Sequence, residues 1–236
     1  MSKAAKLGIL GGLGPMASVY FYEMLTAHTK ASCDAEHIDL VLSSRATTPD
    51  RTAYIIGQSE VDPRPAMIED AKKLQDWGCT HIAIPCNTAH YFYDSIAAAV
   101  SVPVLNIMEE TAACLAADGI RCAGILATDG TVLSHSYEKY LDAHGIRCVL
   151  PSSENQMQIM QIIYGQIKKG QHADMRRFRE SLALRTRRAG VKVVTGVTVT
   201  KEIIEEFQAD AVILAIGADP VVPGIPGLKE HAHHAL

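Results

Sequence analysis

Short apolar runs rich in Val, Ile and Leu alternate along the chain with longer segments whose apolar residues recur every three or four positions. The short runs are typical of buried strands, and the longer spacing is typical of amphipathic helices. The predicted strands cover residues 6–10, 38–43, 81–85, 102–107, 122–127, 147–150, 191–194 and 211–216. The clearest predicted helices cover residues 66–77, 132–143 and 156–168. This alternation predicts an α/β fold with parallel sheets flanked by helices.

The first three and the next three predicted strands form two similar halves, each with a polar loop after an apolar strand. We therefore expect an N-terminal α/β lobe over residues 1–102 and a second α/β lobe over residues 103–188. Residues 189–236 differ in character and are predicted to form a strand, a helix and a strand. Loops that follow parallel strands gather at one edge of a sheet, so a small ligand is expected between the two lobes.

Charge and hydropathy exclude several classes of partner. Lys and Arg total 22 against 26 Asp and Glu, a net charge of −4, and no basic block is long enough to follow a phosphate backbone. Nucleic acid is therefore not an expected partner. No stretch approaches 18 uninterrupted apolar residues, and the N-terminus lacks the apolar run of a signal peptide, so we expect a cytoplasmic protein without a membrane span. The six cysteines show no metal-ligand spacing such as C-x-x-C, so we expect reduced thiols and no metal site.

A glycine-rich turn follows the first predicted strand. Its sequence GLGPMA at residues 12–17 fits the dinucleotide fingerprint G-x-G-x-x-A. That fingerprint also requires an acidic residue near the end of the second strand, where this chain has LSSR at residues 42–45. Pro15 also removes a backbone donor that a pyrophosphate would need. The pattern therefore favours a tight turn that faces a small ligand over a nucleotide site.

The sequence PCNTAH at residues 85–90 ends a predicted buried strand and precedes a predicted helix. A cysteine in that place lies near the positive end of the helix dipole, which favours the thiolate. Asn87 and Thr88 add short polar side chains and the free N–H groups of a first helical turn, which suit a carboxylate. The alternative is a buried structural cysteine whose Asn and Thr neighbours cap the helix. The three residue types together at a strand end favour a functional site.

Five motifs, in order, resemble the aspartate/glutamate racemase family. They are GGLGPMA at 11–17, TPDRT at 48–52, PCNTAH at 85–90, LATDGT at 126–131 and IYGQIK at 163–168. The resemblance runs from about residue 4 to about residue 186. It implies two pseudo-symmetric α/β lobes with a site in the cleft, no cofactor, an amino acid as the small-molecule substrate, and a homodimer.

The resemblance also implies roles for individual residues. Cys86 is the implied catalytic acid/base, and Asn87, Thr88 and Thr128 are implied to hold the α-carboxylate of the substrate. Arg51 and Lys168 are the implied cationic contacts to a side-chain carboxylate. The complete set of implied substrate-binding residues is Met16, Arg51, Asn87, Thr88, Thr128, Thr131 and Lys168. Without the resemblance, Arg51 could equally be a solvated loop charge and Lys168 an ordinary cation near a helix C-terminus.

Racemisation removes a proton from one face of a carbon and delivers one to the opposite face, so a single thiol performs half of the reaction. The family supplies the second cysteine in a Gly-Cys-Thr-Glu motif late in the chain, whereas this chain has Val197 at that cysteine position. Cys79 lies at the opposite end of the strand that leads to Cys86, on the order of 20 Å away. We therefore expect an aspartate/glutamate-type racemase with impaired turnover.

The segment at residues 189–236 resembles an internal piece of FAD/NAD-dependent oxidoreductases of the dienoyl-CoA reductase type. It has no phosphate-binding glycine loop of its own, so it is not expected to hold a flavin. Two alternatives to a racemase stay open: a catalytically inactive protein that binds amino acids or carboxylates, and a flavin- or nicotinamide-binding oxidoreductase fragment.

Overall fold

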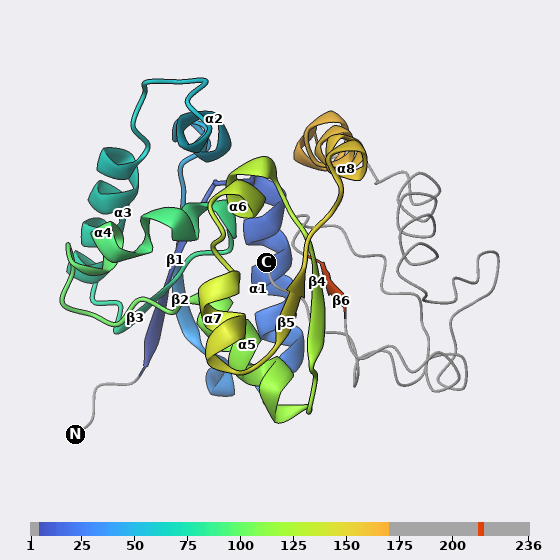
Figure 1. Cartoon of the computed structure of the whole chain (residues 1–236). Helices are drawn as coiled ribbons and strands as arrows, with labels where there is room; N and C mark the ends of the chain where they lie inside the picture. Colours follow the sequence, from blue (N-terminus) through green and yellow to red (C-terminus); the bar gives the residue numbers. More distant parts are fainter. Residues whose placement is uncertain (1–4, 170–211, 215–236) are drawn as a thin grey trace.

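The computed structural model describes residues 5–169 and 212–214. The elements along the chain are β1 (Lys6–Gly11), α1 (Pro15–His28), η1 (Asp34–Glu36), β2 (Asp39–Ser44), α2 (Arg51–Ile55), α3 (Arg64–Asp76), β3 (His81–Ala83), η2 (Thr88–Phe92), α4 (Tyr93–Ala97), α5 (Ile107–Ala117), β4 (Cys122–Leu126), α6 (Asp129–Leu133), α7 (Glu138–Ala143), β5 (Arg147–Val149), α8 (Ser153–Gly165), η3 (Ile167–Lys169) and β6 (Val212–Leu214). Here η denotes a short 3₁₀ helix. The predicted α/β fold with parallel strands and flanking helices is confirmed (Figure 1).

Within the described residues, the strands form two parallel sheets of three strands each. The first has the order β2-β1-β3, and the second has the order β5-β4-β6. β6 belongs to the segment that resembles an oxidoreductase, and it pairs with β4 in the register Gly124↔Val212. The predicted strand at 211–216 is therefore a strand at 212–214, whereas the predicted strand at 191–194 lies outside the described residues. The boundaries proposed for the lobes stay predictions.

The predicted strand at 102–107 is wrong. The segment makes a single parallel bridge, Ile82↔Val104, and α5 already begins at Ile107. Pro103 has no N–H to donate to a ladder. The side chain of Asn106 accepts from the N–H groups of Met108 and Glu109, and this cap starts the helix in place of further strand.

The predicted single helix at 132–143 is also wrong, because the structure divides it into α6 and α7. His135 lies between them in the left-handed region, with φ 53°, which interrupts a right-handed helix. The helices predicted at 66–77 and 156–168 are present as α3 and as α8 followed by η3.

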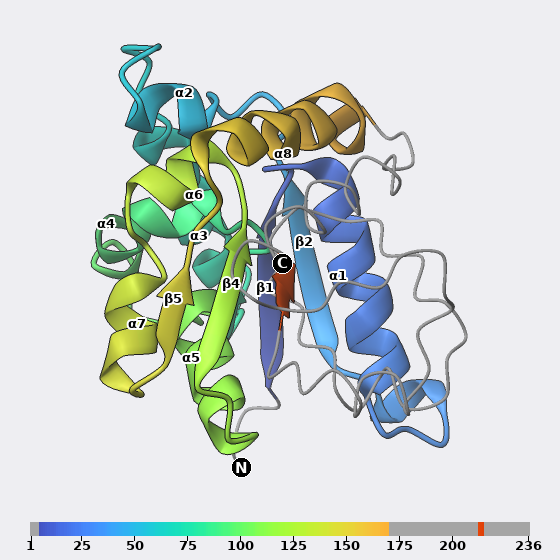
Figure 2. The same cartoon turned by 45° about the vertical axis from the view of Figure 1, so that its right-hand side comes forward.

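Each sheet has its own hydrophobic core. In the first, Leu10, Met67, Leu74, Ile82 and Ile96 are fully buried between β1, β3, α3 and α4. The second core is formed by residues of α5, β4, α6 and α7 with neighbouring loop residues: Met108, Ala112, Leu115, Ala123, Ile125, Ala127, Val132, Tyr137, Leu141 and Ile146. Figures 1 and 2 show α2, α6 and α8 together beyond the strand ends, at the top of both views. The described elements include no helix with the length and apolar character needed to cross a membrane.

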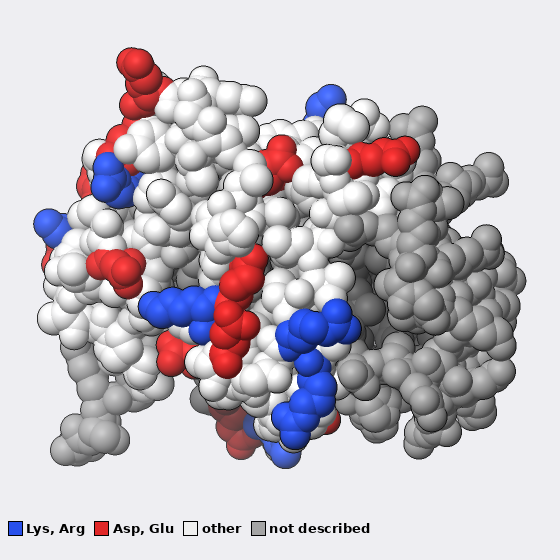
Figure 3. All heavy atoms as spheres, viewed as in Figure 1, with Lys and Arg blue, Asp and Glu red and all other residues white. Residues whose placement is uncertain are grey.

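Acidic and basic side chains are scattered over the face drawn in Figure 3, and near its centre the two signs lie beside one another. This mixture of signs agrees with the near balance of charge in the sequence. It is unlike the single-sign stripe that follows a nucleic-acid backbone.

Candidate active site

Three threonine hydroxyls meet where the loops after β3 and β4 face each other. The Oγ1 atom of Thr88 lies 2.7 Å from that of Thr128 and 3.2 Å from that of Thr131. Thr128 and Thr131 are 3.3 Å apart. All three side chains are buried. We call these residues the threonine cluster. Each hydroxyl can both donate and accept, so the cluster can redirect its hydrogens towards a bound anion.

Gly130 allows the two loops to come this close. A Cβ atom built at position 130 would lie 2.8 Å from Cγ2 of Thr88 and 3.1 Å from Cα of Thr52. Real Cβ atoms are essentially never found at the shorter distance, and the Thr52 contact is with backbone, which cannot swing aside. The absence of a side chain at position 130 therefore lets α6 approach η2 and α2.

Cys86 lies at the same edge, three residues after the end of β3, and is half-buried. Its backbone N–H donates to the carbonyl of Ile84 over 2.7 Å. The helix predicted after Cys86 is the 3₁₀ helix η2 of five residues, followed by the short α4. Two short helices, the first of them a 3₁₀ helix, give a weaker aligned dipole than one regular α-helix would.

Asn87 is buried and reaches the core of the second lobe. The hydroxyl of Tyr137 donates a short hydrogen bond to Oδ1 of Asn87. Tyr137 is 1% exposed, and its burial raises the pKa of the phenol well above its usual range, so the hydroxyl stays protonated and able to donate. Sequence reasoning missed Tyr137, because 50 residues separate it from Asn87 and nothing in its local pattern marks it.

Arg51 is not a solvated loop charge, since its side chain is buried. Its guanidinium donates to three backbone carbonyls: Leu13 over 2.8 Å, Pro49 over 2.9 Å and Thr48 over 3.1 Å. Its Nε atom has no hydrogen-bond partner, and no carboxylate of the described residues forms an ion pair with it. Arg51 is thus a buried cation whose Nε–H donor is unused.

Asp50 joins the start of α2 to the end of α8. It caps α2 by accepting from Ala53 N–H over 2.8 Å, and its carboxylate also accepts from the hydroxyl of Tyr164 over 3.1 Å. Nζ of Lys168 lies 3.4 Å from Asp50 and 3.8 Å from the centre of the Tyr164 ring. Burial alone would raise the pKa of Asp50, but the Ala53 N–H and the charges of Lys168 and Arg51 outweigh it and hold that pKa below its usual value. The charge of Lys168 is therefore partly neutralised by the carboxylate of Asp50.

The glycine turn after β1 offers little to a nucleotide. The N–H of Gly12 donates to Oγ of Ser18 over 3.0 Å, and Pro15 has no N–H. Gly12 has φ 79°, and a Cβ there would lie 2.4 Å from the backbone nitrogen of Arg45. The turn is thus tight, as the sequence predicts. Met16 follows it in the first turn of α1 and is 45% exposed.

The other cysteines lie away from the threonine cluster. Cys79 is buried in the first core, and Cys33 and Cys114 are exposed. Cys122 begins β4, six residues before Thr128, which corresponds to roughly 20 Å of extended chain. Cys148 lies in β5, where it pairs with Ala123 of β4, and burial raises the pKa of its thiol to about 12. The family's second-cysteine position, Val197, lies outside the described residues.

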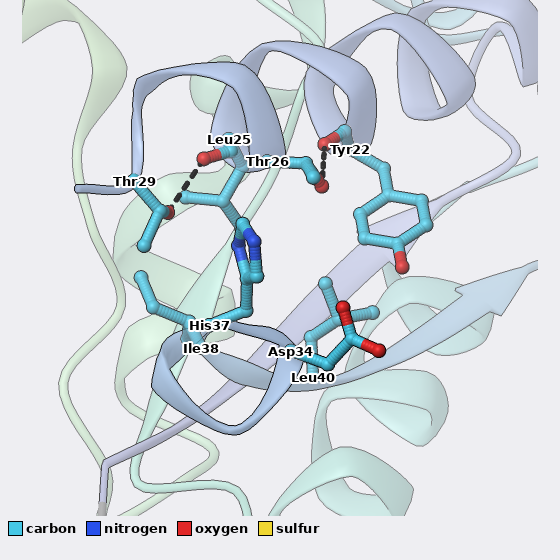
Figure 4. A pocket seen from close by; sticks show the side chains of 8 residues that line it. All are labelled: Tyr22, Leu25, Thr26, Thr29, Asp34, His37, Ile38 and Leu40. Carbon is cyan, nitrogen blue, oxygen red and sulfur yellow. Dashed lines mark hydrogen bonds between the residues drawn. The ribbon is translucent and has the colours of Figure 1, made fainter. Parts of the chain in front are cut away.

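Residues 5–169 and 212–214 offer no metal site, and a hollow on their surface is lined by none of the predicted site residues. No group of three His, Cys, Asp or Glu side chains could hold a metal ion there. A surface hollow of about 280 Å³ lies between α1, η1 and β2 (Figure 4). Its lining residues are Tyr22, Leu25, Thr26, Thr29, Asp34, His37, Ile38 and Leu40. None of the predicted site residues is among them.

Two racemases are similar to this chain in sequence or in structure. The chain is 34% identical over 143 residues to the broad-specificity amino-acid racemase RacX of Bacillus subtilis, which covers 59% of this chain and 61% of RacX. The aspartate racemase of Picrophilus torridus has a similar structure, with a TM-score of 0.71, 26% identity, and coverage of 98% of this chain and 88% of that one.

A third match is of another kind. An NADH oxidase of Thermoanaerobacter brockii is 43% identical over 58 residues, which is 25% of this chain and 9% of the oxidase. Because the match covers so little of the oxidase, it does not support an oxidase activity for this chain. The oxidoreductase resemblance of residues 189–236 stays a prediction. The family model for Asp/Glu/hydantoin racemases matches residues 10–217. The chain belongs to the Asp/Glu/hydantoin racemase family.

Proposed function

We propose that this protein is a cofactor-independent amino-acid racemase in which Cys86 is the acid/base on one face of the substrate α-carbon. The observation that carries the proposal is the position of Cys86 and Asn87 directly before Thr88, whose hydroxyl joins the threonine cluster at the facing strand ends. Family membership supports the same conclusion. RacX and the Picrophilus torridus protein both bear names of amino-acid racemases.

The site residues suit the removal of a weakly acidic α-proton. In the proposed reaction the thiolate of Cys86 takes that proton, and the electron pair left on carbon spreads into the adjacent carboxylate. Asn87 and the threonine cluster supply the hydrogen-bond donors that stabilise the charge developing on those carboxylate oxygens. Because the three hydroxyls are buried, such donors interact more strongly than they would in water.

For the substrate side chain we propose a carboxylate, as in aspartate or glutamate. Arg51 is a buried cation with an unused donor, and a bound carboxylate would compensate its charge. Lys168 is the weaker candidate, because Asp50 already faces it. Aspartate and glutamate differ by one methylene, a difference that a pocket separates by about 1–3 kcal/mol.

Impaired turnover remains part of the proposal. All six cysteines of the chain lie within the described residues, and Cys86 alone among them follows a strand at the threonine cluster. A site with one thiol exchanges the α-proton of one enantiomer with solvent without inverting it. A second base contributed from residues 170–211 would restore inversion.

Exchange of the α-proton in D₂O tests the proposal. Each enantiomer of aspartate, glutamate and alanine is incubated with the protein, and proton NMR follows the loss of the α-signal while chiral chromatography follows inversion. We expect exchange of one enantiomer of an acidic amino acid, with inversion slower than exchange. Exchange of none of the six compounds would contradict the racemase proposal.

The absence of a second cysteine at the site favours one alternative, an inactive amino-acid-binding protein. Calorimetric binding of a dicarboxylic amino acid without α-proton exchange would support that alternative. We also propose a homodimer in the cytoplasm, on the resemblance alone. Light scattering of the purified protein tests the dimer.

A further inference from the structure

The ring of His90 lies buried between Cys86 and the start of α5. Nδ1 is 2.9 Å from the carbonyl oxygen of Cys86. Nε2 is 3.2 Å from the backbone nitrogen of Ile107, the first residue of α5. One imidazole thus joins the residue that carries the candidate acid/base to the first helix of the second lobe.

These two partners select one state of the ring. The N–H of Ile107 can only donate, so Nε2 must present its lone pair, and the ring hydrogen must sit on Nδ1. That hydrogen then donates to the Cys86 carbonyl. In a protonated ring, the Nε2–H would face the N–H of Ile107, and the two donors would repel each other. The only acceptor near Nε2 would then be the carbonyl of Leu105, 3.4 Å away. Burial lowers the pKa of His90, although the Cys86 and Leu105 carbonyls raise it in part, so the ring is neutral at neutral pH.

The face of the ring is fixed as well. Tyr93 stacks on His90, with ring centroids 6.1 Å apart and planes 9° from parallel. The hydroxyl of Tyr93 in turn donates to the carbonyl of Val104 over 2.9 Å. His90 is therefore held at both edges and on one face, which makes it a rigid link.

We propose that His90 is a positioning residue that holds the backbone of Cys86 and thereby aims its thiol at the substrate α-carbon. The inference rests on the proposed role of Cys86. His90 has no part in proton transfer, because both of its nitrogens are engaged by backbone groups. A misplacement of about 1 Å in a reacting group costs on the order of 100-fold in rate, so the link acts on the rate while leaving substrate affinity nearly unchanged.

Two substitutions separate the two ends of the link. In His90→Asn the amide nitrogen takes the place of Nδ1, so the bond to the Cys86 carbonyl is kept and the bond from Ile107 is lost. In His90→Gln the amide oxygen takes the place of Nε2, so the bond from Ile107 is kept and the bond to Cys86 is lost. We expect His90→Asn to stay within about 3-fold of the unmodified protein in kcat for α-proton exchange, and His90→Gln to lose roughly 10- to 100-fold, with KM within about 2-fold in both.

A second readout needs no turnover. The rate of Cys86 alkylation by iodoacetamide is measured against pH at the Cys86 peptide by mass spectrometry. We expect the profile of His90→Asn to match that of the unmodified protein and that of His90→Gln to differ. A purely structural role would lower Tm in both variants and change their kcat and alkylation profiles alike, and equal behaviour of the pair overturns the inference.

The two proposals fail in distinguishable ways. If the unmodified protein exchanges no α-proton, the proposed function fails, and the alkylation profiles alone decide the role of His90. If the His90 variants do not fold, Ile107→Pro removes the N–H that Nε2 accepts. Proline is tolerated there because Ile107 is the first helical residue and Asn106 before it is extended, with φ −97° and ψ 105°. Because this variant keeps the bond from Nδ1 to the Cys86 carbonyl, we expect kcat within about 3-fold of the unmodified protein and an unchanged alkylation profile, as for His90→Asn; a loss of about 10-fold or more contradicts the inference.

Discussion

The loops after β3 and β4 meet at the ends of two parallel sheets, yet they carry different chemistry. The first contributes a thiol, an amide and a hydroxyl, and an imidazole and a phenol hold these in place. The second contributes two hydroxyls and a glycine. Under the proposed function, the two loops divide the work: one carries the reacting group, and the other provides binding groups and close approach.

Removing the thiol tests the first loop and has the largest expected effect. We expect Cys86→Ser to lower the rate of α-proton exchange by roughly 1,000-fold, because the alcohol is a far weaker acid than the thiol. Deuterium incorporation by NMR measures the loss. Cys114→Ser, at an exposed position in α5, is the matched control and should exchange normally. Equal rates in the two variants would assign the chemistry to another group.

Adding a methyl group to the second loop tests the close approach. We expect Gly130→Ala to destabilise the fold by about 1–3 kcal/mol, because the new Cβ meets Thr88 and the backbone of Thr52. Urea denaturation measures the change. Gly165→Ala is the control, because a Cβ there meets nothing within 4 Å. A Gly130→Ala variant as stable as its control would mean that the loops can separate without cost.

Breaking one bond between the lobes has a smaller effect. Tyr137→Phe removes the donor to Asn87 and keeps the ring in the core, and we expect a loss of about 1 kcal/mol in unfolding free energy. KM for the substrate should rise roughly 10-fold as the Asn87 amide loses its fixed orientation. Tyr91→Phe, at an exposed ring, is the control in the same denaturation and kinetic assays. An unchanged KM would show that Asn87 does not contact substrate.

Acid provides the mildest test, at the contact between Asp50 and Lys168. The pKa of Asp50 is below its unfolded value, so the ionised carboxylate stabilises the fold above about pH 5. That contribution is lost as the pH falls through the lowered pKa. We expect Asp50→Asn, which retains an N-cap oxygen, to show a shallower fall in Tm between pH 6 and pH 3. Asp142→Asn in α7 is the exposed control. Parallel Tm curves for Asp50→Asn and the unmodified protein would contradict the assigned coupling.

Much of the scaffold follows from local pattern. Strands such as β1, β2 and β4 are apolar runs with a polar end, and their pairing in parallel follows from the helices between them. The errors arise where single residues override the pattern. Pro103 and Asn106 end a predicted strand, and the left-handed backbone of His135 divides a predicted helix.

The candidate site divides in the same way. Cys86, Asn87 and Thr88 are adjacent in sequence, so their shared location was predictable, and the motif after β4 made Thr128 and Thr131 candidates. The residues that orient them were not predictable as such. Nothing in the local pattern of Tyr137 marks it, and His90, although it ends the PCNTAH motif, makes a contact with Ile107 that depends on how the two lobes meet. The role of Gly130 was not predictable either, because it depends on how closely Thr88 and Thr52 approach it in the folded chain.

The guanidinium of Arg51 couples parts of the chain that are distant in sequence. Leu13 belongs to the turn after β1, and Thr48 and Pro49 belong to the loop after β2, yet all three share one side chain. An anion that shifted this side chain towards itself would also have to move the backbone of both turns or break their hydrogen bonds to Arg51. The affinity for such an anion would then depend on the rigidity of both turns. A substitution that alters the backbone of either turn would change that affinity without contacting the anion.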